Sequence, residues 1–175
     1  MADCCLSTNR KTMESNNQES LKKLKELVEE VKIAMLCTSQ HEHLRSRPMS
    51  TAQFDDEGDI WFFTNDHSGK VNEVAGNHQI CLAYSSPSKN SYVSISGDAR
   101  IVNDWAKMKE LYNPAINAWF PKGLDDPNLA LLKVTPLQAE YWDSSSSTMI
   151  VLFNMAKAIV SGEKYNEGQH GKIEL

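Results

Sequence analysis

"RPMSTAQFDDEGDIWFFTNDHSGK", residues 47–70, has the pattern of a β-hairpin that ends in a polar loop. The residues up to Phe54 predict a long strand over 44–54, and the aromatic and β-branched run 60–64 predicts a second strand. Between them DDEGD predicts a tight turn, in which Gly58 can adopt a positive φ. The hairpin has an apolar middle and gathers cations and hydroxyls toward its open end, and this arrangement favours a bound anion.

The register of this hairpin predicts which side chains meet. If Phe54 pairs with Ile60, counting outward places Arg47 opposite His67, immediately beside Ser68. A slip of one or two residues does not move Arg47 far. We therefore expect four side chains to converge at the open end of the hairpin: Arg47, Thr64, Ser68 and Lys70.

This group of residues has the chemistry of a phosphate site. Ser68 begins a short predicted helix over 68–77, ended by Gly76, and the free N–H groups at a helix start favour an anion. Arginine can grip a phosphate through two donors, and lysine adds a point charge. The neighbouring WFF and RPM segments offer flat apolar surface and strand backbone. A phosphate beside a planar hydrophobic ring predicts a flavin mononucleotide (FMN) site, but a solvated loop and an ordinary helix cap remain alternative interpretations.

The rest of the chain alternates between short strand patterns and a few helices. Apolar residues recur at helical spacing after Ser20, Asp104 can cap a helix over 104–112, and a third helix is predicted over 147–162. Further strand patterns cover 33–39, 78–86, 91–102, 129–136 and 139–144, and the tail after residue 162 is polar. About six strands with hairpin-length connections predict a mainly β (α+β) fold, an antiparallel barrel with helices at its edges.

Length and composition limit the class of protein. The chain has 175 residues, 41% of them hydrophobic and 23% charged, which fits one globular domain. Residues 1–17 are polar and patternless, so we expect a disordered tail followed by a single domain over 18–175. The net charge of −5 argues against nucleic-acid binding. No apolar run approaches the ~20 residues of a membrane helix and no secretory signal is visible, so we expect no membrane contact and a cytoplasmic location.

The cysteines and acidic segments predict neither a disulfide framework nor a metal site. Cys4 and Cys5 lie in the polar tail, Cys37 and Cys81 lie in apolar strand patterns, and no C-x-x-C motif is present. Free thiols in a reducing cytosol are the favoured interpretation. HEH at 41–43 lacks a third ligand, and DDEGD is too short for a calcium loop.

The order and spacing of several short motifs resemble the pyridoxamine 5'-phosphate oxidase superfamily, the FMN-binding split barrels, over roughly residues 18–175. The hairpin has the family's strand Arg, its acidic Gly-containing turn, its aromatic pair before Thr-Asn, and the Ser and Lys that follow. SYVSISGDARIV and AEYWDS continue the resemblance. WFPKGLDDPNLALLKVTP and GQHGKIEL are closer to the general stress protein subgroup (general stress protein 26-like). The resemblance implies a six-stranded split β-barrel.

The resemblance also implies which residues bind FMN. Arg47, Ser68 and Lys70 would hold the phosphate, with help from Thr64. The strand segment Pro48, Met49, Ser50 and Thr51 would lie along the ring and ribityl chain, largely through its backbone, and Phe62 and Phe63 would line the pocket. The family is a homodimer with FMN at the interface, so Trp119 and Trp142 are candidates for an outer wall that involves the partner chain.

The substrate-binding part of the oxidase is not matched. This chain has Ala52, Gly69 and Tyr92 where the oxidase has a strand Lys, an Arg and a Gln. After Trp142 the oxidase carries an Arg-x-His segment that grips the vitamin phosphate, whereas SSSSTMIVLFN at 144–154 has neither residue. The ligands of the FMN phosphate remain, and the ligands of the substrate phosphate do not.

We therefore expect an FMN-dependent oxidoreductase of the general stress protein type that acts on an unidentified small molecule. The sequence identifies no catalytic acid or base. Three alternatives stay open: a flavin-binding or flavin-sensing protein without turnover, a haem-associated relative of the same fold, and pyridoxamine 5'-phosphate oxidase activity.

Overall fold

The computed structural model describes residues 21–40, 43–143 and 169–174. A helix covers residues 21–31. The strands are β1 (Ile33–Gln40), β2 (His43–Phe54), β3 (Ile60–Asn65), β4 (Gln79–Ser86), β5 (Ser91–Val102), β6 (Leu129–Asp143) and β7 (Gln169–Glu174). Between them lie the helices α2 (Gly69–Gly76) and α3 (Trp105–Leu111), and the 3-10 turns η1 (Pro87–Lys89), η2 (Pro114–Ala118) and η3 (Gly123–Asp125). None of the helices in these ranges is long and apolar enough to cross a membrane.

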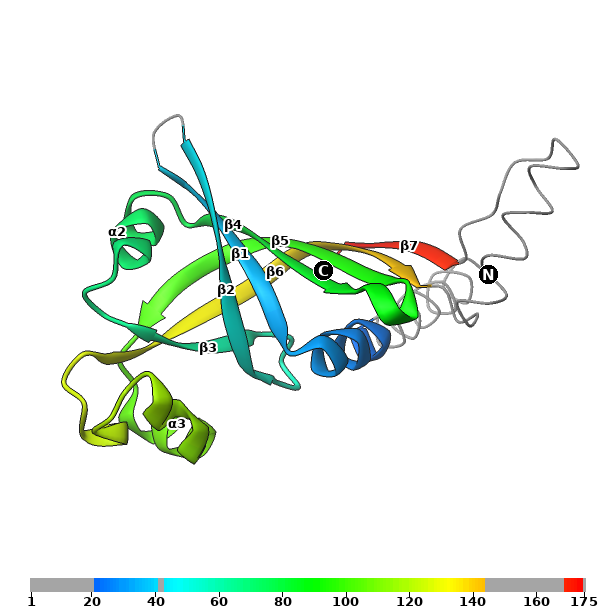
Figure 1. The fold of residues 1–175 in the computed structure, drawn as a ribbon. Coiled ribbons are helices and arrows are strands. Elements are labelled where there is room, and N and C mark those ends of the chain that lie inside the picture. The colour runs from blue at the N-terminus through cyan, green and yellow to red at the C-terminus, as the bar shows by residue number, and fades with distance from the viewer. Residues whose placement is uncertain (1–20, 41–42, 144–168, 175) are drawn as a thin grey trace, which may run out of the picture.

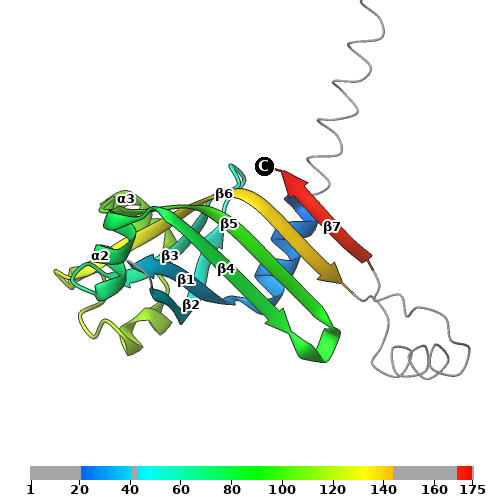
Figure 2. The ribbon, with the colours of Figure 1, turned by 90° about the horizontal axis from the view of Figure 1, so that it is seen from above.

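The strands form one antiparallel sheet that closes on itself. Their order is β3-β2-β1-β4-β5-β6-β7, and β3 also pairs with β6. The pairing of β3 with β6 closes the six strands β1, β2, β3, β4, β5 and β6 into a barrel. Strand β7 extends the sheet beyond β6 (Figures 1 and 2). The predicted fold class, a mainly β (α+β) six-stranded split β-barrel with flanking helices, is confirmed.

The barrel interior is packed with alternate residues of its strands. Ile60 and Phe62 of β3 are fully buried there, beside Leu36 of β1 and Leu82 of β4. The helix over 21–31 places its own leucines and valines against the same core, as its 3.6-residue apolar spacing predicts. Full burial of one such side chain contributes roughly 1.5–3 kcal/mol to folding, so this cluster is the main source of the barrel's stability.

A second apolar cluster lies on the other face of β3. Trp61 of β3 and Leu131 of β6 pack here against Met108 of α3 and Phe120 of the following loop. Trp61 also donates a hydrogen bond from Nε1 to Asp55 at 2.7 Å. The ammonium groups of Lys107 and Lys133 each lie 5.3 Å from the centre of its ring. Strand β3 is therefore buried on both faces, which accounts for its unbroken apolar sequence.

Two segments of the C-terminal half differ from the sequence prediction. The stretch predicted as two strands is the single strand β6, which stays paired with β5 across a register shift opposite Ser96 and Gly97. Pro136 is accommodated at this irregularity, where a strand tolerates a residue without an N–H. Residues predicted as part of a polar tail form β7, which pairs with the end of β6. The helix predicted over 147–162 and the tail predicted over 1–17 lie outside the described residues.

The hairpin prediction is correct near the turn and wrong at the open end. Phe54 pairs with Ile60 as expected, but a bulge at Ala52 shifts the register, and the last β2–β3 pair is Thr51 with Phe62. Farther out, β2 pairs with β1 alone. Helix α2 follows the end of β3 and contacts β1 and β5 (Figure 1). Its Glu73 also bonds to Arg45 and Arg47 in residues 43–50 of β2, the part paired with β1 alone, which we call the free end of β2.

Candidate functional site: a cationic cavity between β2 and α2

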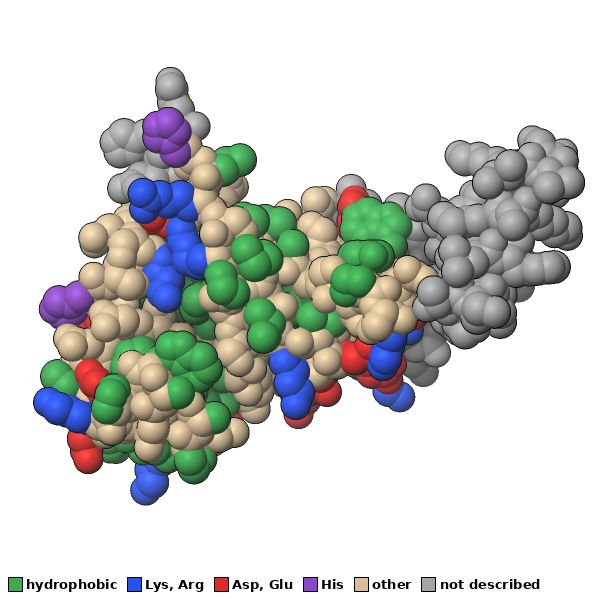
Figure 3. Space-filling view, in the orientation of Figure 1, with side chains coloured by type: hydrophobic (Ala, Val, Ile, Leu, Met, Phe, Trp, Pro, Cys, Tyr) green, Lys and Arg blue, Asp and Glu red, His purple; other side chains and the backbone are tan. Residues whose placement is uncertain are grey.

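An open cavity of about 570 Å³ lies between the free end of β2 and the first turns of α2. We call it the cationic cavity, and its lining residues are Arg45, Ser46, Arg47, Ser68, Gly69, Lys70 and Glu73. Figure 3 shows Lys and Arg side chains gathered over this hollow. The structure thus brings together Arg47, Ser68 and Lys70, as the sequence predicted, although by a different route from the hairpin register.

Local periodicity explains how these side chains meet. Arg45, Arg47 and Met49 alternate along β2 and therefore share one face of the strand. On α2, Gly69 and Lys70 lie four and three residues before Glu73, and residues at these spacings share one face of a helix. The two faces oppose each other across the cavity.

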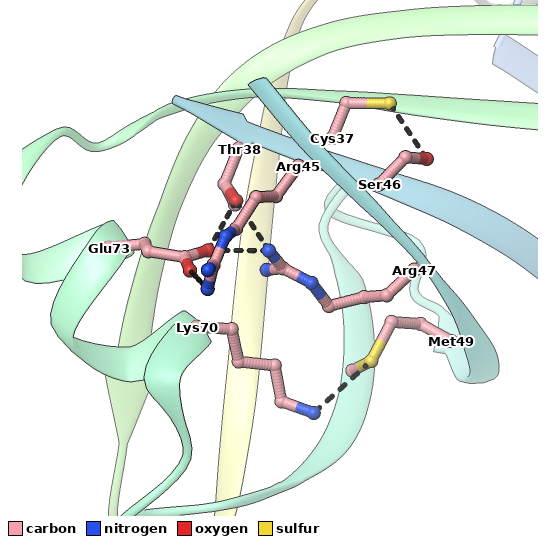
Figure 4. Close-up of polar contacts among 8 residues, drawn as sticks. All are labelled: Cys37, Thr38, Arg45, Ser46, Arg47, Met49, Lys70 and Glu73. Atoms are coloured by element: carbon pink, nitrogen blue, oxygen red, sulfur yellow. Dashed lines mark hydrogen bonds and ion pairs between the residues drawn. The ribbon is translucent and has the colours of Figure 1, made fainter. Parts of the chain in front are cut away.

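Glu73 is the centre of the polar network (Figure 4). Its Oε2 accepts from Thr38 Oγ1 at 2.6 Å and from Arg47 Nη2 at 2.5 Å, and its Oε1 accepts from Arg45 Nη1 at 3.1 Å. The side chain is only 2% exposed. Burial alone would raise the pKa of Glu73, but the Thr38 hydroxyl and the two guanidinium groups outweigh it and hold the pKa below its usual range. Glu73 is therefore a buried carboxylate that stays ionised.

Three buried polar atoms have no hydrogen-bond partner within the described part of the chain: Arg47 Nη1, Thr64 Oγ1 and Ser68 Oγ. A buried polar atom left unpaired costs about 1–3 kcal/mol, and such atoms are rare in native proteins. All three can donate a hydrogen bond. Arg47 and Ser68 line the cavity, and Thr64 of β3, which was predicted to join them, is not among the lining residues. The two unpartnered donors at the cavity fit a ligand that supplies acceptor oxygens, such as a phosphate.

Lys70 completes the donor set. Its ammonium donates to Met49 Sδ at 3.5 Å, and a thioether sulfur is a weak acceptor. Burial lowers the pKa of Lys70, and the charge of Arg47 lowers it further. An anion in the cavity would oppose this lowering of the Lys70 pKa, because it would supply the negative charge that the ammonium lacks.

The remaining predicted FMN contacts on β2 and β3 are divided between the two sides of the barrel wall. Pro48 and Ser50 are exposed, whereas Met49 is 6% exposed and packs in the core. Thr51 is hydrogen-bonded through its hydroxyl to the buried Tyr84 at 2.9 Å. The pKa of Tyr84 is raised, chiefly by burial, so it remains a neutral phenol.

The predicted aromatic contacts do not line the cationic cavity. Phe62 is fully buried in the barrel core, and Phe63 packs against the second apolar cluster on the opposite face of β3. Trp119 lies after η2 and is 72% exposed, while Trp142 lies near the end of β6, paired with Tyr92 and His170. Within one chain, these four residues are not brought together with Arg47.

Sequence reasoning missed Arg45, Glu73 and Thr38. Arg45 lies two residues before Arg47, and strand alternation alone could have placed it on the same face. Glu73 lies three residues after Lys70, which is one turn of the predicted helix. Thr38 pairs with Arg45 across β1 and β2, a register that the sequence did not reveal.

The acidic hairpin turn forms a compact group of its own. Oxygens of Asp55, Glu57 and Asp59 all lie within 4.8 Å of one another. Asp55 accepts from the backbone N–H groups of Glu57 and Asp59 and from Trp61, and Asp59 accepts from Thr135 at 2.6 Å and pairs with Lys133. These bonds account for Asp55 and Asp59 as parts of the turn and its anchoring to β6.

Comparison with known proteins gives consistent matches across most of the chain. A family model described as "Pyridoxamine 5'-phosphate oxidase like" matches residues 19–166. General stress protein 26 of Bacillus subtilis is 27% identical over 140 residues, which cover 78% of this chain and 98% of that protein. A solved structure from Jannaschia sp. CCS1, named for general stress protein 26, has a TM-score of 0.73 at 26% identity and covers 90% of this chain and 99% of its own. The general stress FMN/FAD binding protein of Xanthomonas citri has a TM-score of 0.66 at 32% identity, with coverages of 74% and 92%.

Proposed function

The chain belongs to the pyridoxamine 5'-phosphate oxidase-like family, and we propose that its cationic cavity binds FMN through the phosphate. Arg47, Ser68 and Lys70 would hold the phosphate, with Thr64 as a further hydroxyl donor nearby. The observation that carries the proposal is the pair of buried, unpartnered donors at Arg47 and Ser68, which line the cavity together with the poorly paired ammonium of Lys70. The FMN/FAD binding described for the similar Xanthomonas citri protein is in agreement with it.

The free end of β2 offers a second binding surface. From His43 to Ser50 this strand pairs only with β1 among the described strands, so the other backbone edge of Pro48, Met49 and Ser50 is not used by the sheet. A strand edge presents alternating N–H and C=O groups. We propose that this edge lies along the flavin ring and ribityl chain, which requires backbone contacts rather than the side chains of Met49 and Thr51. Phe62 and Phe63 would then support the site from within the barrel wall.

We further propose that the chain is a flavin-dependent oxidoreductase of the general stress protein type, located in the cytoplasm and acting on a small molecule. A bound flavin supplies hydride transfer, and the protein supplies binding and orientation. Anaerobic mixing with NADH or NADPH, followed by absorbance at the flavin band and a screen of electron acceptors, tests this proposal. Flavin that no reductant bleaches would favour the binding or sensing alternative. Turnover of pyridoxamine 5'-phosphate near the enzyme median of about 10 s⁻¹ would favour the oxidase alternative.

The protein should bind FMN about 10²–10⁴-fold more tightly than riboflavin, because Arg47 and Lys70 each add a charge-assisted bond of roughly 1.5–3 kcal/mol. This preference should decline at alkaline pH. The pKa of Lys70 is lowered in the free protein, and the phosphate would raise it, so FMN binding takes up a proton and weakens as pH rises through the lowered pKa. Fluorescence titration of both flavins across a pH series measures this. Equal affinity for the two flavins would refute the phosphate site.

We also propose a homodimer with FMN at its interface. Beside the cavity, the outer face of β1 exposes Ile33 and Met35, which are 56% and 40% exposed, and β5 exposes Tyr92 on the same wall. Figure 3 shows hydrophobic side chains over the middle of the face that carries the cavity. A contiguous apolar surface on a barrel wall is typical of an interface. Trp119, which is 72% exposed, would be available to a partner, and we propose that Trp142 borders the same interface.

Light scattering should therefore give about twice the mass of one chain, and FMN should strengthen the association by linkage. Met35→Lys should weaken the dimer, because it places a charge on the apolar face, while leaving the fold intact since Met35 is exposed. A monomer that holds FMN tightly at micromolar protein would contradict the interface.

A further inference from the structure

We infer that Glu73 is a positioning residue, whose carboxylate holds Arg47 so that its free guanidinium nitrogen faces the phosphate of the ligand. The inference rests on the proposed function and deepens it, since it assigns a role to an anion inside an anion site. Glu73 is not itself a ligand of the phosphate in this assignment.

The hydrogen bonds of Arg47 are divided between its two terminal nitrogens. Nη2 donates to Thr38 at 2.9 Å and to Glu73 at 2.5 Å, and Nη1 is buried without a partner in the described residues. Because a guanidinium is planar, fixing Nη2 fixes the direction of Nη1 as well. Figure 4 shows this group held between β1, β2 and α2.

Without Glu73, Arg47 would lose this restraint. An arginine side chain has many rotamers, and ordering it when the ligand arrives opposes binding. In the structure the ordering is already present, because Glu73 is 2% exposed and is itself held by Thr38 and Arg45. The site is thus organised before the ligand binds.

The charge balance explains why a carboxylate is tolerated here. The residues that line the cavity carry three positive charges, on Arg45, Arg47 and Lys70, and one negative charge, on Glu73. The lining therefore has a net charge of two positive charges. A phosphate monoester carries about −1.5 to −2 at pH 7, so it matches this net charge. Arg45 is more exposed than Arg47, 62% against 22%, and pairs with the other oxygen of Glu73, so it neutralises the carboxylate from the solvent side.

One substitution, Glu73→Gln, changes the FMN affinity in opposite directions depending on whether Glu73 positions Arg47 or acts only through its charge. Glu73→Gln removes a negative charge beside the phosphate, which by Coulomb attraction alone would tighten FMN binding. If Glu73 positions Arg47, the same change should weaken FMN by about tenfold, the equivalent of one well-placed hydrogen bond. Riboflavin affinity should stay unchanged, because riboflavin has no phosphate. The ratio of the two affinities is a readout that general destabilisation would not move.

A matched control is Glu110→Gln, which removes the same charge from an exposed ion pair with Lys107 on α3. It should leave both flavin affinities at the wild-type values. Thr38→Val keeps the side-chain volume and removes the hydroxyl shared by Arg47 and Glu73, and it should reduce the FMN-to-riboflavin ratio by a smaller factor. This variant keeps the inference testable if Glu73→Gln fails to fold in a circular dichroism melt.

The outcomes distinguish the proposal of an FMN phosphate site from the inference that Glu73 positions Arg47. If wild-type protein binds FMN no better than riboflavin, both the phosphate site and the role of Glu73 are overturned. If the wild type prefers FMN and Glu73→Gln binds FMN equally well or more tightly, only the positioning role is overturned. A reduced ratio in Glu73→Gln and Thr38→Val, with Glu110→Gln unchanged, supports it.

Discussion

Replacing both Arg47 and Lys70 by Met should weaken FMN binding by roughly 3–6 kcal/mol, or about 10²–10⁴-fold. Both side chains are partly buried at the cavity, where a charge-assisted bond is less screened by water and salt than on the open surface. Methionine keeps most of the apolar stem of each residue and removes the cation, and at Arg47 it also removes the hydrogen bonds to Thr38 and Glu73. Riboflavin affinity should change little, since the ring and ribityl contacts are proposed to come from the β2 backbone. Titration of both flavins by fluorescence measures the difference.

The matched control for this double variant is Arg100→Met with Lys109→Met. Both residues are exposed, on β5 and α3 respectively, and the pair makes the same change in net charge. The control should retain wild-type FMN affinity at moderate salt. If it loses affinity as severely as the cavity variant, the effect is one of overall charge, and the phosphate does not bind between Arg47 and Lys70.

Gly97→Ala should destabilise the fold by about 1–3 kcal/mol or more, the range for overpacking a site that cannot relax. A Cβ at Gly97 would lie 2.5 Å from the backbone oxygen of Thr135 and 3.1 Å from the Cα of Pro136. Both atoms belong to the backbone of β6, so no side-chain rotation can relieve the contact, and the bulge between β5 and β6 must open. For a chain of this size, the melting temperature should fall by roughly 2–4 °C per kcal/mol.

Gly76→Ala is the control for this prediction, because a Cβ at Gly76 would meet nothing within 4 Å. Gly76 is the last residue of α2, where alanine has the better helix propensity, so its stability should be unchanged or higher by up to about 1 kcal/mol. Thermal and urea denaturation of the two variants side by side give the comparison. Equal stability of Gly97→Ala and the wild type would show that β6 moves freely at the bulge.

Local features of the fold could be predicted because their causes are local. Gly58 has a φ of +93° in the turn for which a glycine was expected. Asp104 accepts from the backbone N–H of Lys107, as its position before an amphipathic run predicted. Strand limits were also close, since β-branched and aromatic runs bounded by turn residues define them. In each case a few neighbouring residues determine the structure.

What could not be predicted depends on partners that are distant in sequence. The bulge at Ala52 arises where β2 leaves β3 for the free end that pairs only with β1, and no residue near Ala52 signals this. β7 has a polar sequence, so its pairing with β6 has no apolar pattern to reveal it. Two cations of the cavity, Arg47 and Lys70, were expected from the sequence, whereas Arg45 and Glu73 were not. A buried carboxylate such as Glu73 is acceptable only once Thr38, Arg45 and Arg47 are known to surround it.

The burial of β3 on both faces has a consequence for how this architecture can vary. Its inward residues hold the barrel core and its outward residues hold the cluster beneath α3, so few substitutions in β3 are neutral for folding. The cationic cavity uses none of those side chains as its lining. It is formed by the free end of one strand and a helix of eight residues, both outside the β3–β6 closure. Substitutions in the residues that line the cavity can therefore change its ligand while the barrel stays intact. In this way a single fold can bind unrelated ligands.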